Sequence, residues 1–207
     1  MTLFIDLRAG ACGGICAPEA SVWEDGTTLL SVTEFRSRVR GRDLVLATHG
    51  FNVSRQDGID ALSNWSRLMS LSGSDLFVGV LWPGDSRYLP VLDYPAEGDE
   101  AIASGRLLAR FLNEYAGSAA SVSLVSHSLG GRVILEATSG LDRTVRRLIL
   151  MAGAIEDDCL TREYQAAAGN LPQPSAPSAD SAPVPAIPEF EGWKSAWSAG
   201  AVSSGLD

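Results

Sequence analysis

Residues 122–131 of the sequence read Val-Ser-Leu-Val-Ser-His-Ser-Leu-Gly-Gly. The first four form a short apolar run that is typical of a buried strand, and a helical pattern extends from Ser128 to about Thr138. A sharp turn from strand to helix would force Ser128 into a strained backbone conformation that exposes its hydroxyl group. Such a turn needs small residues two positions before and two positions after, which Ser126 and Gly130 supply. The pattern predicts a serine nucleophile at position 128, although an ordinary strand-to-helix turn would carry similar residues.

A second motif, His-Gly-Phe-Asn at residues 49–52, directly follows another apolar run. A loop at this place can donate a backbone N–H to the oxyanion that forms during acyl transfer. We expect the Phe51 N–H to be one such donor and the Leu129 N–H to be the other, with Gly50 allowing close approach of the backbone. His49 is expected to be structural and to bond the loop backbone rather than to act in catalysis.

Short apolar runs alternate with helical patterns as far as about residue 165. This alternation predicts an α/β fold, a three-layer sandwich in which crossover units build a mostly parallel sheet. A Gly-rich loop is expected from the end of the first strand to about residue 27. The expected strands are 2–8, 44–48, 76–82, 122–125 and 148–152, and the expected helices are 31–40, 128–138, 159–168 and two that begin near 54 and 96.

Charge and hydropathy exclude several classes of protein. The chain has 207 residues, a formal net charge of −9 and a pI near 4.7. An acidic surface repels phosphate backbones and anionic membranes, so neither nucleic acid nor a membrane surface is an expected partner. The sequence has no apolar segment long enough to span a bilayer, and Asp6 interrupts the apolar N-terminal run, which argues against a secretory signal.

The three cysteines, Cys12, Cys16 and Cys159, are an odd number in a chain without an expected export signal. We therefore expect reduced thiols and a cytoplasmic location. Cys12 and Cys16 lie close together, but a zinc site would need two more ligands. The two histidines, His49 and His127, belong to the other motifs, so no metal ion and no cofactor are expected.

Composition changes abruptly after Ala168. Residues 170–188 contain six of the ten prolines, among Ala and Ser, and we expect residues 169–207 to be an extended or disordered linker and tail. Phe190, Trp193 and Trp197 are spaced to share one helix face. They could form a docking peptide for a partner or a lipid, but we favour the alternative, which is a short helix that covers an exposed sheet edge or simply a disordered segment. The domain itself is expected to span residues 1–168.

Four groups of residues together resemble the α/β-hydrolase superfamily, in particular a bacterial branch of it. They are the loop at 49–53, the Trp-Pro at 82–83, the His-Ser-Leu-Gly-Gly at 127–131 and the segment 150–159. The resemblance covers about residues 42–166. It implies an α/β-hydrolase-like sandwich and a serine hydrolase that acts on an ester or a related small acyl substrate through an acyl-enzyme on Ser128. In this superfamily the triad runs in the order Ser, Asp or Glu, then His.

The sequence departs from that order because no histidine follows residue 127. The side chain of His127 is expected to leave the turn on the opposite side from Ser128. The last two strands of the superfamily fold also have no counterpart, so the sheet is expected to stop after the sixth strand position. Asp157 and Asp158 are candidates for the triad acid, but they could instead cap the helix expected from Cys159, and we favour the cap.

Three functional hypotheses remain open at this point. The first is a working serine hydrolase with an unidentified base. The second is a truncated, catalytically impaired hydrolase scaffold with a binding role or none. The third is an interaction module that uses the aromatic residues of the tail.

Overall fold

The central sheet has the strand order β3-β2-β1-β5-β4-β6-β7 in the computed structural model, which describes residues 1–10, 15–85, 94–153 and 158–172. Strands β1, β5, β4, β6 and β7 are parallel, and β2 and β3 are antiparallel additions at one edge. The strands are β1 (Leu3–Arg8), β2 (Cys16–Glu24), β3 (Thr28–Leu30), β4 (Asp43–Thr48), β5 (Asp75–Leu81), β6 (Ser121–His127) and β7 (Arg147–Met151). The helices are α1 (Val32–Val39), α2 (Arg55–Leu68), α3 (Tyr94–Tyr115), α4 (Gly130–Ser139) and α5 (Gln165–Gly169).

Capping residues fix where the first two helices begin. Ser31 and Glu34 form a capping box at the start of α1, in which each side chain accepts a hydrogen bond from the other residue's backbone N–H. Ser54 caps α2 by accepting a hydrogen bond from the Asp57 N–H at 3.2 Å. Because α2 starts directly after residues 49–53, its cap also fixes the end of the predicted oxyanion loop.

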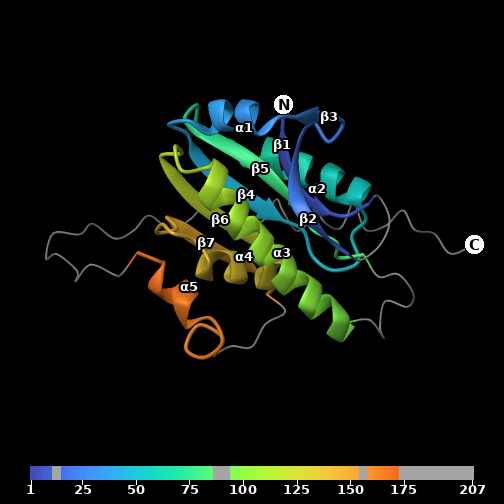
Figure 1. Ribbon diagram of the computed structural model, residues 1–207, viewed down its shortest axis with the longest axis vertical. Helices are drawn as coiled ribbons and strands as arrows, with labels where there is room; N and C mark the ends of the chain where they lie inside the picture. Colours follow the sequence, from blue (N-terminus) through green and yellow to red (C-terminus); the bar gives the residue numbers. More distant parts are fainter. Residues whose placement is uncertain (11–14, 86–93, 154–157, 173–207) are drawn as a thin grey trace, which may run out of the picture. The chain divides into compact units, whose positions relative to one another are not determined.

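Helices cover both faces of the sheet, which gives the expected three layers (Figure 1). Alternate residues of β1 show the division. Leu3, Ile5 and Leu7 pack in one cluster with α1, α3 and α4, whereas Phe4 packs in a second cluster with α2. Period-two alternation places successive side chains on opposite faces, and β1 is buried along its whole length because both faces are covered.

Two expectations about local structure were wrong. Residues 16–24 form strand β2 instead of the expected loop, and β2 pairs antiparallel with β1 and with β3, a short strand at 28–30 that was not expected. β2 is less buried than β1, and its sequence lacks the continuous apolar run from which the other strands were predicted. The helix expected over 159–168 is also shorter, because residues 158–164 form turns and α5 begins only at Gln165.

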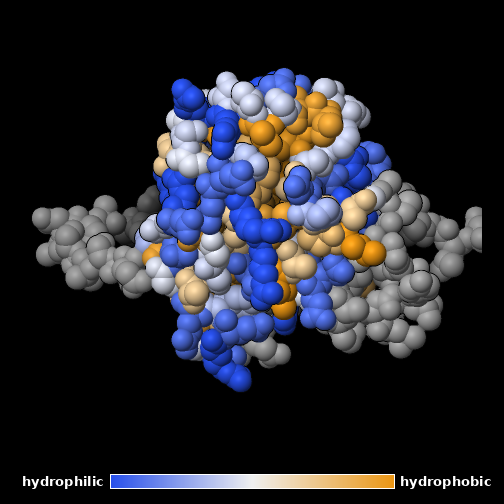
Figure 2. All heavy atoms as spheres, viewed as in Figure 1, coloured by the Kyte–Doolittle hydropathy of each residue, from blue (hydrophilic) through white to orange (hydrophobic). Residues whose placement is uncertain are grey.

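The surface seen in Figure 2 is mostly hydrophilic, and its hydrophobic groups gather toward the end that carries β3. Leu29 and Val32 are among the exposed large apolar residues in that part of the chain, and Leu29 is 62% exposed. Among the described helices, none combines the length and the hydropathy needed to cross a bilayer. The aromatic residues of the predicted tail, in 173–207, lie outside the described residues.

Candidate active site

The two sequence motifs meet at the carboxyl ends of neighbouring strands. β4 and β6 pair in parallel with Thr48 opposite Ser126, so the loop after β4 and the turn after β6 leave the sheet side by side. Contact between them is close, because a Cβ atom added to Gly130 would lie 2.3 Å from the His49 carbonyl oxygen. Ligands of open α/β sheets bind at this edge of the strands, so the location suits an active site.

Ser128 has the backbone conformation of a nucleophile turn. Its backbone φ angle is 50°, in the left-handed region that residues other than glycine rarely adopt. The Ser128 N–H donates to the Met151 carbonyl at 2.9 Å, so the neighbouring strand β7 holds the turn in place. Ser126 is fully buried, which explains why this position needs a small residue, although it is not the glycine usual in this motif.

The loop at 49–52 leaves no space for a side chain at its second residue. A Cβ atom on Gly50 would lie 2.9 Å from His127 Nδ1 and 3.2 Å from Ser128 Cβ. Glycine therefore lets the loop backbone lie against the turn that carries Ser128. The next residue, Phe51, is half-buried and packs against the main core. The Phe51 backbone N–H therefore belongs to a loop that lies in direct contact with Ser128, the predicted nucleophile.

The start of α4 lies immediately after Ser128. The Gly131 and Arg132 N–H groups donate to the carbonyl oxygens of Ser128 and Leu129, at 2.9 and 3.0 Å. The Leu129 N–H precedes both of these at the same helix end, and the Leu129 side chain is buried. A helix N-terminus carries a partial positive charge, so this end of α4 favours a developing negative charge.

His49 is a structural residue of the loop. It is buried, its Nδ1 lies 2.9 Å from the Gly50 oxygen, and its Nε2 lies 3.3 Å from the Trp82 backbone nitrogen. The Trp82 N–H can only donate, so Nε2 accepts and the proton of the neutral ring sits on Nδ1, which donates to Gly50. Burial lowers the pKa of His49 to about 4. Both ring nitrogens are therefore occupied in backbone bonds, as expected for a histidine that does not take part in proton transfer.

His127 is the other histidine and lies beside the loop. It is half-buried, and this burial lowers the pKa of its ring below the ordinary value, which keeps the ring neutral near pH 7. His127 and Ser128 share the space beside the Gly50 Cα, so His127 lies against the loop that carries the predicted oxyanion donor.

On its described contacts, Asp158 does not join this cluster. Asp157 lies outside the described residues. The Asp158 carboxylate forms an ion pair with Arg162 at 3.0 Å, and its backbone oxygen accepts from Thr161. The interpretation of Asp158 as a cap for a helix from Cys159 was wrong, because no helix starts there. A role for either aspartate as the triad acid stays a prediction.

Sequence reasoning missed the residues that support the loop. Arg8, at the end of β1, is buried and donates to the Trp82 carbonyl at 3.0 Å. Its other nitrogen forms an ion pair with Asp85. The available signal was the pair of charges, Asp6 and Arg8, inside an otherwise apolar strand. Charged residues are rarely buried without a partner, so their presence there predicts a buried polar network.

A cavity on the described surface lies apart from the predicted site residues. It has a volume of about 290 Å³ and is lined by residues of β2, α1 and α3, including Leu107, Arg110 and Tyr115, and by none of the predicted site residues. Within the described ranges, no three His, Cys, Asp or Glu side chains come together in a way that could hold a metal ion. Of the two cysteines considered as metal ligands, Cys16 is described and is a free thiol, and Cys12 lies outside the described residues.

Comparison with known proteins identifies the family of this chain. A family model described as an alpha/beta hydrolase of unknown function, DUF900, matches residues 30–176, which is well over half of the chain. The match includes both motifs and the strands β4 to β7 that carry them. No curated protein matches the chain. The strand order, the turn at Ser128 and the family match agree, and the chain belongs to the DUF900 family of α/β-hydrolases.

Proposed function

We propose that this chain is a serine hydrolase that cleaves an ester or a related small acyl substrate through an acyl-enzyme on Ser128. The observation that carries the proposal is the left-handed backbone of Ser128, at φ 50°, in a turn packed against Gly50. Strain of this kind persists only where the surrounding structure imposes it, and such strain concentrates at active sites. In this proposal the enzyme is a cytoplasmic protein with reduced thiols.

The proposed chemistry uses the Ser128 hydroxyl, the two predicted oxyanion donors and an unidentified base. The Ser128 Oγ attacks the acyl carbonyl carbon while a base accepts the hydroxyl proton, and the carbonyl oxygen becomes an oxyanion. The N–H groups of Phe51 and Leu129 donate to that oxyanion, and the N-terminus of α4 adds a favourable field. The leaving alcohol takes up a proton as the acyl-enzyme forms, and water then releases the acid and regenerates Ser128.

A second candidate function is an impaired hydrolase scaffold, and His49 favours it. The sequence contains two histidines, and both nitrogens of this one are bonded to backbone. An enzyme without its triad histidine keeps some catalysis from the oxyanion hole and from binding. Its turnover would be on the order of a million-fold below that of a complete triad. Ligand binding would then be the remaining role of the site.

Hydrolysis of p-nitrophenyl acetate distinguishes the two candidates. The assay compares the full chain with Ser128→Ala, and it uses Ser139→Ala at the far end of α4 as a control for removing a serine hydroxyl. Steady release of nitrophenolate that disappears only in Ser128→Ala, with an acetyl adduct on the Ser128 peptide, supports the hydrolase. Equal release by all three folded proteins would overturn it and leave the scaffold.

A further inference from the structure

A buried guanidinium group stands at the carboxyl end of β1. The Arg8 side chain is only 1% exposed. β1 pairs in parallel with β5, with Asp6 opposite Leu81, so Arg8 comes next to the turn formed by residues 82–85. Its position is therefore set by strand register, at the same edge of the sheet as the predicted active site.

Arg8 holds this turn at two points. Nη1 donates to the Trp82 carbonyl at 3.0 Å, and Nη2 donates to the Asp85 carboxylate. A guanidinium group is planar and presents its donors in a fixed geometry, so the two contacts fix the two ends of the turn relative to each other. Lysine carries the same charge but cannot reproduce this geometry.

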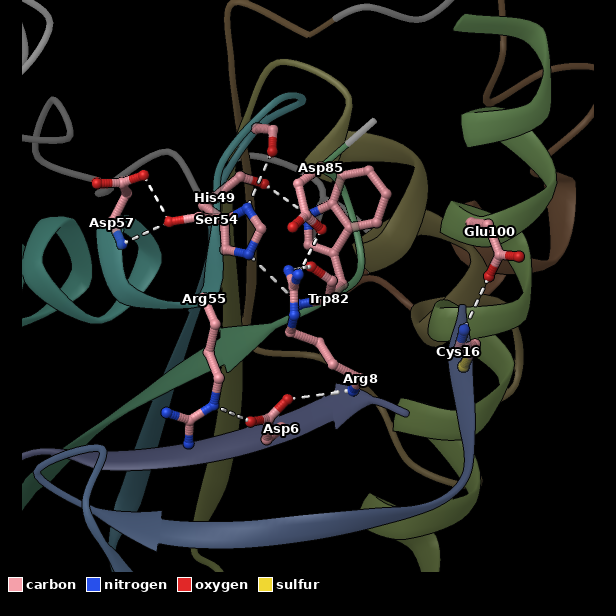
Figure 3. Close-up of polar contacts among 11 residues, drawn as sticks. Asp6, Arg8, Cys16, His49, Ser54, Arg55, Asp57, Trp82, Asp85 and Glu100 are labelled. Carbon is pink, nitrogen blue, oxygen red and sulfur yellow. Dashed lines mark hydrogen bonds and ion pairs between the residues drawn. The ribbon is translucent and has the colours of Figure 1, made fainter. Parts of the chain in front are cut away.

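The turn at 82–85 contacts the predicted oxyanion loop at two places. The Trp82 indole N–H donates to the His49 carbonyl at 2.9 Å, and the two rings stack with centroids 5.8 Å apart. Farther along the loop, the Asn52 N–H donates to the Gly84 carbonyl at 2.5 Å. Phe51, the predicted oxyanion donor, lies between these two attachments. Figure 3 shows Arg8 and Asp85 beside the His49–Trp82 pair.

A second ion pair fastens the end of the same loop. One Asp6 oxygen accepts from the Arg8 backbone N–H at 3.1 Å, and the other accepts from Arg55 Nε at 2.6 Å. Arg55 is the first residue of α2, directly after the loop, and its guanidinium group also lies 4.9 Å from the centre of the Trp23 ring. β1 thus contacts the turn at 82–85 through Arg8 and the first residue of α2 through Asp6, and these two charged residues lie on one face of the strand.

Stability alone does not explain this ion pair, in which Arg8 is buried and Asp85 is partly buried. Desolvation of two charges opposes their attraction, and a well-packed apolar pair of similar volume is often no less stable. A requirement for fixed geometry does explain it. We propose that Arg8 is a positioning residue, which acts through the turn at 82–85 to hold the Phe51 N–H where the oxyanion forms. The catalytic part of this inference rests on the proposed hydrolase function.

Three variants test the proposal. Arg8→Lys keeps the charge without the planar donors, and Arg8→Met removes both. The double variant Arg8→Met with Asp85→Leu removes both charges of the ion pair, so that neither charge is left without the other. Arg38→Met is the matched control, because Arg38 pairs with Glu24 at the other end of β1.

Hydrogen exchange of the peptide that covers residues 49–52 reports on position without any need for activity. We expect exchange there to accelerate about ten-fold or more in all three variants, because the loop opens locally, while β6 stays protected. The kcat for p-nitrophenyl acetate should fall about 100-fold, with little change in KM, because a misplaced donor weakens the transition state. Arg8→Lys should retain more activity than Arg8→Met, and Arg38→Met should leave exchange and kcat unchanged.

Unchanged exchange at 49–52 in a folded Arg8 variant would overturn the positioning role, whatever the activity. Failure of all three variants to fold would overturn it as well, because Arg8 would then be a residue of general stability. If the unsubstituted chain and Ser128→Ala hydrolyse the ester equally, the hydrolase proposal fails, and exchange at 49–52 still decides the effect of Arg8 on the loop.

Discussion

Acidification should destabilise the folded protein through His49. Burial lowers the pKa of this residue from the ordinary 6.5 to about 4. As the pH falls below about 6.5, the unfolded chain binds a proton that the folded protein does not, so stability decreases until about pH 4 and then levels off. The difference of about 2.5 pKa units corresponds to a maximum loss of about 3.4 kcal/mol at 1.36 kcal/mol per unit. At about pH 4.5 the loss should be about 2.5 kcal/mol.

Urea unfolding near pH 7 and near pH 4.5 measures this loss. His49→Asn removes the titrating ring, and its side-chain amide can still donate to the Gly50 carbonyl. The variant should lose about 2.5 kcal/mol less than the unsubstituted protein over this interval. Glu34 and Asp75, whose pKa values are lowered by hydrogen bonds from Ser31 and Ser72, should contribute equally to both proteins.

His127→Asn is the control, because burial also lowers the pKa of His127 and gives a contribution of the same sign. That variant should keep the part of the pH dependence that belongs to His49. If His49→Asn and the unsubstituted protein lose the same stability between the two pH values, the reasoning from burial is refuted.

Glycine and serine positions near the site give two further predictions, both measured as urea unfolding free energies. Gly130→Ala should destabilise by about 1–3 kcal/mol, because the added Cβ would lie 2.3 Å from the His49 carbonyl oxygen. Gly98→Ala in α3, where an added Cβ meets nothing within 4 Å, should instead stabilise the protein by about 0.5–1 kcal/mol. If the unfolding free energy changes in the same direction in both variants, the steric argument is contradicted. Ser128→Gly should be more stable than Ser128→Ala by about 1 kcal/mol, because the backbone φ angle is 50° there. At Ser139 in α4 the order should be reversed, with Ser139→Ala more stable than Ser139→Gly. The same order of glycine and alanine at both positions would show that the turn is not strained.

Local patterns were enough for several parts of the molecule. The strand, turn and helix around Ser128 follow from an apolar run, a set of small residues and a helical period, all within about twenty residues. The start of α1 follows from Ser31 and Glu34, three residues apart. In each case the interactions that select the conformation join residues close in the sequence, so they can be read without knowledge of the fold.

Strands without a continuous apolar run could not be found in this way. β2 is only partly buried, and what makes it a strand is antiparallel pairing with β1 on one side and β3 on the other. Such pairing depends on which segments the fold brings together, and propensity in a strand mainly reflects its neighbours.

For the candidate site, too, part of the arrangement could be predicted from the sequence and part depended on the tertiary structure. The two motifs indicated which loop and which turn would form the site, and the parallel pairing of β4 with β6 brings them to one edge of the sheet. Tertiary structure alone decided that Arg8 reaches Asp85, 77 residues away, and that His49 is enclosed with both nitrogens bonded. Long-range ion pairs and desolvation depend on what the fold packs around a charge, and no local pattern records this.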